Sequence, residues 1–107
     1  MNLPAILKPL VLPARYDELS PTAKRLVREE YARLQGGRCW YCSEMLSGPP
    51  SAEVQSKSVD GVVWPQGFFD WPVHLHHDKV TGLTIGAVHC RCNAVSFKYE
   101  ELPNMEP

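Results

Sequence analysis

Apolar side chains recur at helical spacing along the stretch TAKRLVREEYARLQ, and charged side chains occupy most positions between them. The apolar face comprises Leu26, Val27, Tyr31 and Leu34. Ser20-Pro21 is a typical helix start, because the serine caps free amides and proline is tolerated at the first helical position. Gly36-Gly37 is a typical helix stop, since glycine adopts the left-handed conformation. The pattern predicts an amphipathic helix over residues 18–36, with a charged face, which includes Arg28, of ordinary solvated surface.

A second pattern, nearer the C-terminus, is typical of paired strands. The stretch HLHHDKVTGLTIGAVH reads as a strand, a turn at Thr81-Gly82 and a second strand. A final helix is expected from about Arg91 to Glu101. These elements predict a ββα core over residues 73–101 and, with the first helix, a small α+β fold.

The segment between the two patterns, residues 47–72, has no clear period. It contains short β-prone runs and a possible tight turn at Asp60-Gly61, so two strands and an irregular insertion both fit. Its aromatic side chains are expected to form core or a minicore rather than to stack on bases. They are Trp64, Phe68, Phe69 and Trp71. The proline-rich residues 1–17 are expected to form an extended arm.

Composition places the chain among small single domains: it has 107 residues, of which 44% are hydrophobic and 21% charged. A core of this size benefits from a metal or a disulfide. The net charge of −1 does not indicate a nucleic-acid-binding protein, so any DNA-binding surface must be a local patch. No apolar run is long enough to cross a membrane, and Pro4, Pro9 and Pro13 interrupt any signal peptide, so a cytoplasmic location is expected.

Because the cytoplasm is reducing, the four cysteines are expected to bind a metal rather than to form disulfides. Cys39-x-x-Cys42 has the spacing that lets two thiolates of one turn bind a tetrahedral zinc ion, and His89-x-x-Cys92 repeats that spacing. Cys90 and Cys92 are one residue apart and have little room to converge on one ion. The favoured ligands are therefore Cys39, Cys42, His89 and Cys92, with Cys90 in place of His89 as the alternative. Four protein ligands leave no open position, which makes the expected Zn²⁺ structural.

A second polar site is indicated by three histidines and an aspartate within five residues, namely His74, His76, His77 and Asp78. In a strand, His74 and His76 project to one face and His77 to the other, unless the chain bends. Such a group of side chains is more typical of a catalytic or binding site than of a packed core.

In their order, these motifs resemble the HNH (ββα-metal, or His-Me finger) nucleases, and within them the phage recombination endonuclease VII group. GRCWYC, HLHHDK, VTG and GAVHCRCN follow one another as the corresponding motifs do in that group. Counted without a gap from Gly86 to Asn93, His89 falls on the first cysteine of the second pair. The resemblance covers about residues 17–100, apart from the segment between Leu46 and Pro72. It implies a zinc-stapled ββα-metal fold.

The resemblance also implies a metal-dependent DNA endonuclease that hydrolyses phosphodiesters, namely a phage-encoded nicking or branched-DNA-cleaving enzyme that acts in the cytoplasm of a bacterial host. His77 falls on the general base that deprotonates a water molecule. His76 and Asn93 fall on the ligands of one catalytic Mg²⁺ or Mn²⁺, and His74 has a supporting role near the phosphate. The candidate DNA contacts are Lys79, Arg91 and Lys98.

Departures from the family leave several points open. Lys79 replaces a family histidine, and His76 stands where the endonuclease VII group has an aspartate, which favours softer divalent ions than Mg²⁺. The long dimerising helices of the junction-resolving enzymes do not follow the motif helix, so monomer and dimer both fit. A catalytically silent zinc-bound module that binds DNA or a protein is the alternative function, and a hydrolase with catalytic zinc is a third.

Overall fold

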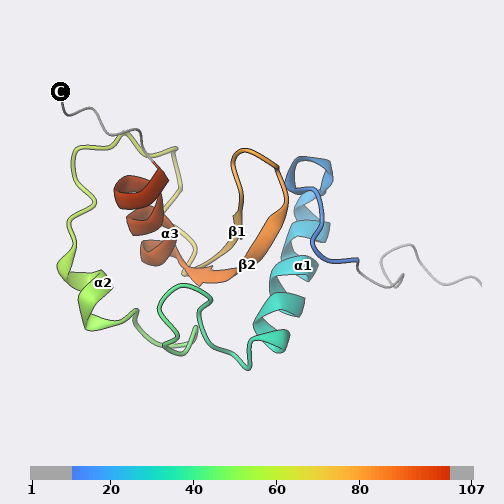
Figure 1. Ribbon diagram of the computed structural model, residues 1–107, viewed down its shortest axis with the longest axis horizontal. Coiled ribbons are helices and arrows are strands. Elements are labelled where there is room, and N and C mark those ends of the chain that lie inside the picture. The colour runs from blue at the N-terminus through green and yellow to red at the C-terminus, as the bar shows by residue number, and fades with distance from the viewer. Residues whose placement is uncertain (1–10, 102–107) are drawn as a thin grey trace, which may run out of the picture.

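The first helix, α1 (Pro21–Leu34), begins where the sequence predicts. In the computed structural model, which describes residues 11–101 (Figure 1), the Ser20 hydroxyl accepts a hydrogen bond from the Ala23 N–H at 3.1 Å. The helix is shorter than the predicted 18–36, because residues 16–18 form a separate 3-10 turn. Val27 is buried as expected, whereas Leu34, the last helical residue, is 60% exposed and does not belong to the packed face.

Strands β1 (Val73–His77) and β2 (Thr84–His89) form a two-stranded antiparallel sheet. Their turn is closed by a hydrogen bond from the Gly82 N–H to the Asp78 carbonyl at 2.8 Å, and Gly82 has a φ of 76° that favours glycine. The register places His76 opposite Gly86 and is then interrupted by a bulge between His76 and His77. The extra residue is Ile85 of β2, which has no partner in β1.

Helix α3 (Cys90–Ser96) follows β2 directly and continues into a π-helical turn, Phe97–Glu101, over the range expected for the final helix. Figure 1 shows α1 on one side of the β1–β2 hairpin and α3 on the other. The small α+β fold class is thereby confirmed. Among the described residues, the largest fully buried side chains are Val27, Val88, Val95 and Cys92. A core of such small side chains gives limited stabilisation, so a bound ion would contribute strongly.

The segment 47–72 forms one short helix, α2 (Ala52–Ser56), followed by turns, and none of its residues lies in a strand. The two-strand alternative and the hairpin turn at Asp60-Gly61 are therefore wrong. The aromatic minicore is found in part: the rings of Trp64, Phe68 and Phe69 pack together, but Trp71 is 70% exposed. Because the apolar residues of this segment have no regular spacing, its path depends on long-range contacts.

The N-terminal arm expected over residues 1–17 lies outside the described residues for positions 1–10. From position 11 onward it runs along the hairpin, where the Thr84 N–H donates to the Ala14 carbonyl at 2.8 Å and the Tyr16 N–H to the Gly82 carbonyl at 2.8 Å. Within residues 11–101, no helix has the length and apolar character that a membrane crossing needs.

Candidate metal centre and histidine hollow

Cys39 and Cys42 lie on a tight turn between α1 and α2. The turn is closed by hydrogen bonds from the Cys39 N–H to the Glu44 carbonyl at 2.8 Å and from the Ser43 N–H to the Cys39 carbonyl at 2.9 Å. The Tyr41 N–H points at the Cys39 sulfur, 3.3 Å away. Backbone amides aimed at a sulfur stabilise its thiolate form, which is the form that binds zinc.

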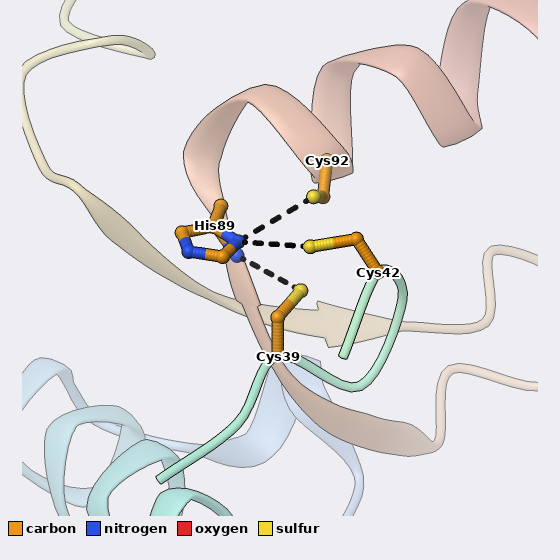
Figure 2. Close-up of side chains that lie close together, drawn as sticks. All are labelled: Cys39, Cys42, His89 and Cys92. Carbon is orange, nitrogen blue, oxygen red and sulfur yellow. Dashed lines mark hydrogen bonds between the residues drawn. The ribbon is translucent and has the colours of Figure 1, made fainter. Parts of the chain in front are cut away.

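His89 and Cys92 complete a cluster with this turn, as Figure 2 shows. The ligand atoms of the four residues lie within 4.8 Å of one another. His89 Nδ1 is 3.5 Å from the Cys42 sulfur and 3.6 Å from the Cys92 sulfur. For a tetrahedral zinc ion, Zn–S and Zn–N bonds of about 2.3 and 2.0 Å place sulfur and nitrogen roughly 3.5 Å apart. The four residues favoured by the spacing thus form a Cys3His cluster with dimensions suited to zinc.

The orientation of the His89 ring fits a metal ligand. Its Nε2 lies 2.9 Å from the Met45 carbonyl, which can only accept, so Nε2 carries the proton. The lone pair is then on Nδ1, the atom that faces the sulfurs. A backbone carbonyl on the far nitrogen is the usual means of orienting a histidine ligand.

The thiols of the cluster already perturb one another. A hydrogen bond from the Cys92 thiol lowers the pKa of Cys39 to about 4, against the opposing effect of burial, and the same bond raises the pKa of Cys92. One sulfur is thus predisposed to be a thiolate.

Cys90 points away from the cluster. Its thiol donates to the Phe68 carbonyl at 3.3 Å, and burial raises its pKa to about 11. The alternative cluster with Cys90 in place of His89 does not correspond to this arrangement. Cys90 instead fixes the end of the segment 47–72 to α3.

The second group of predicted residues is linked by hydrogen bonds. His76 Nδ1 donates to the Asn93 side-chain oxygen at 3.1 Å, and the Asn93 side-chain nitrogen donates to His74 Nδ1 at 3.0 Å. His74 and His76 come from alternate positions of β1, and Asn93 from the first turn of α3. Burial is the main cause that lowers the pKa of both histidines, which keeps them neutral near pH 7.

His77, the next residue of β1, does not belong to this hydrogen-bonded row. Its ring stacks on Tyr16 with centroids 3.8 Å apart and planes 10° apart. Burial, and secondarily the charge of Lys79, lowers the pKa of His77 to about 4. The imidazole is thus neutral at physiological pH and able to accept a proton.

His74, His77 and Asn93 line one open hollow of about 420 Å³, which we call the histidine hollow. His76 is buried behind Asn93 and is not part of its wall. The hollow also contains Lys79 and Arg28. Arg28 was expected on the solvated face of α1. The spacing of apolar residues within one helix does not reveal that a charged residue of that helix faces another element.

The three predicted DNA contacts differ in their surroundings. Lys79 is exposed at the hollow. Arg91 donates to the carbonyls of Val54, Gln55 and Lys57, and Lys98 donates to those of Ser58 and Asp60. Arg91 therefore holds the end of α2 against α3, and Lys98 holds the residues after α2 against the π-helical turn that continues α3.

No protein-family description matches the chain, and neither the curated proteins nor the solved structures searched contain a significant match to it.

Proposed function

We propose that this chain is a metal-dependent DNA endonuclease of the HNH type, with the Cys3His cluster as a structural zinc site and the histidine hollow as the catalytic site. The observation that carries the proposal is the meeting of His74, His77 and Asn93 around one open hollow that also holds two cationic side chains. Neutral imidazoles beside positive charge suit proton abstraction near a phosphate.

His77 is the proposed general base. Its pKa of about 4 keeps the ring unprotonated, and the stack on Tyr16 fixes its plane, so that it can take a proton from a water molecule in the hollow. Lys79 and Arg28 would bind the phosphate oxygens and hold the phosphate in one orientation.

His76 and Asn93 are the proposed ligands of a catalytic divalent ion. Their facing atoms are 3.1 Å apart, close to the roughly 3 Å between neighbouring ligands of an octahedral ion with bonds of about 2.1 Å. For His76 Nδ1 to bind a cation, its proton would move to Nε2, the other neutral tautomer, and the lone pair freed on Nδ1 would face the ion. When bound, it would supply charge stabilisation of the phosphate and the leaving oxygen.

The test is nicking of supercoiled plasmid by zinc-loaded protein with Mg²⁺ or Mn²⁺ added. His77→Ala should lower the nicking rate by about 10²–10⁴-fold, the usual contribution of a general base, with zinc content and melting temperature retained. Val80→Ala is the matched control, because Val80 is 93% exposed on the same hairpin turn and outside the histidine hollow.

Equal rates for wild type and His77→Ala would exclude His77 as the base. Wild-type protein that binds DNA but does not nick it with either ion would favour the silent binding module instead. Activity restored by zinc alone, without Mg²⁺ or Mn²⁺, would favour zinc as the catalytic ion.

A further inference from the structure

A second, smaller hollow lies beside the histidine hollow and has apolar walls. It has a volume of about 260 Å³, and the rings of Trp64, Phe68 and Phe97 line it together with Val63 and Pro65. The Trp64 ring centroid is 4.8 Å from that of Phe68 and 5.8 Å from that of Phe97. We call it the aromatic hollow.

Hydrogen bonds hold these walls in place. The Trp64 indole N–H donates to the Val59 carbonyl at 3.0 Å, and the Phe68 N–H donates to the Pro65 carbonyl at 3.0 Å. The Phe68 carbonyl in turn accepts from the Cys90 thiol on α3. The aromatic hollow is therefore built between the segment 47–72 and α3, and it is preformed.

The two hollows are adjacent and share walls, because Pro65, Phe68, Lys79 and Asn93 line both. The Lys79 ammonium lies 6.0 Å from the Phe97 ring centroid and is exposed. A ligand with an anionic group in the histidine hollow and an attached flat ring would place the ring in the aromatic hollow, with Lys79 between them. A nucleotide has this combination of groups.

We propose that the aromatic hollow binds one unstacked nucleobase next to the phosphate in the histidine hollow, so that the substrate is single-stranded or locally unpaired DNA. This inference rests on the proposed nuclease function. Aromatic side chains stack on any base that is free of its duplex neighbours, whereas a paired and stacked base cannot enter a hollow. The hollow is smaller than the roughly 300–1,000 Å³ of sites for larger ligands, which suits one ring system and not a base pair.

The experiment measures binding of a short single-stranded DNA carrying one 2-aminopurine, and of the same strand in a duplex, to zinc-loaded protein without added Mg²⁺ or Mn²⁺. Wild type should bind the single strand more tightly and change the fluorescence of the probe base. Phe97→Leu should weaken single-strand binding by roughly tenfold and leave duplex binding unchanged. Phe69→Leu is the matched control, because Phe69 is an aromatic neighbour of Trp64 that is 47% exposed and does not line the hollow.

Val63→Glu provides a second variant if Phe97→Leu does not fold. Val63 is 99% exposed at the rim, so a carboxylate there should leave the core undisturbed and should weaken binding of an anionic single strand at the hollow. Equal affinity of wild type for duplex and single strand, or equal loss in the Phe97 and Phe69 variants, would overturn the inference. If nicking of plasmid persists in that case, only the base site is refuted; absence of both nicking and DNA binding would refute the nuclease proposal as well.

Discussion

At the scale of single residues, the cysteines differ most clearly in role. Cys39 belongs to the Cys3His cluster, whereas Cys90 donates to a carbonyl outside it. Zinc binding in small domains is coupled to folding and contributes about 10 kcal/mol or more, comparable to the whole stability of a domain.

Replacing Cys39 should therefore unfold the protein. We expect Cys39→Ala to lose its zinc and its cooperative melting transition, because the remaining ligands cannot close a tetrahedral site. Cys90→Ala should keep one zinc ion per chain and melt cooperatively. Metal analysis and circular dichroism check both, and a Cys39→Ala protein with full zinc content would contradict the assignment.

The low pKa of His77, about 4, predicts an unusual pH dependence. The native state binds the proton more weakly than the unfolded chain, whose histidines titrate near pH 6.5. The stability contribution of neutral His77 is thus fully present above pH 6.5 and is lost as the pH falls towards 4. Nicking should likewise persist below pH 6.5, because the base stays unprotonated.

NMR titration of the histidine rings checks this prediction directly. The resonances of His77 should shift with a midpoint well below 6.5, and those of Tyr16, its stacking partner, should follow the same midpoint. A His77 midpoint at or above 6.5 would show that water reaches the ring freely and that burial does not control its charge.

At the scale of elements, the close contact between β2 and the cysteine turn depends on Gly86. A Cβ atom there would lie 2.8 Å from the Gln35 side-chain oxygen and 3.0 Å from Trp40 Cβ. The Gln35 oxygen is held by the Ala87 N–H at 2.9 Å and cannot move without breaking that bond.

Gly86→Ala should consequently destabilise the protein by about 1–3 kcal/mol, the usual cost of overpacking. Gly48→Ala is the matched control, since the nearest atom to a Cβ there is 3.9 Å away and Gly48 has no positive φ. Urea denaturation of the two variants should separate them clearly. Equal stability would mean that the turn moves away from the strand without cost.

Sequence alone predicted those elements whose signals are local. The helix start at Ser20, the Thr81-Gly82 turn and the two x-x spacings of the zinc ligands all act within a few residues, and the structure contains each of them. The irregular pairing beside His77 was not predicted, because it depends on how the two strands pair. The position of Arg28 was missed because it depends on how α1 packs.

At the scale of the whole molecule, the segment 47–72 is held by side chains from the distant helix α3. Arg91 donates hydrogen bonds to three carbonyls at the end of α2, those of Val54, Gln55 and Lys57. The shortest of these bonds, 2.6 Å, goes to the Lys57 carbonyl. No local period could predict this path, because the contacts link residues more than thirty positions apart.

Arg91→Met should release this segment while the zinc cluster stays intact. We expect faster limited proteolysis near residues 57–60 and a loss of about 1 kcal/mol, because three part-buried or exposed carbonyls lose the Arg91 donor. The measurement is cleavage mapping by mass spectrometry beside zinc content. A variant with unchanged proteolysis but weaker DNA binding would instead support Arg91 as a phosphate contact.

Cys92 and Asn93 are neighbours in the first turn of α3, so the proposed zinc ligand and the proposed catalytic ligand share one rigid piece of backbone. A change in the size of the ion among the sulfurs would therefore reach Asn93 through a single peptide unit. Cadmium, a larger and equally thiophilic ion, should keep the protein folded and lower the nicking rate by displacing Asn93 relative to His76. The proposed activity would then depend on the identity of a metal that touches no reacting atom.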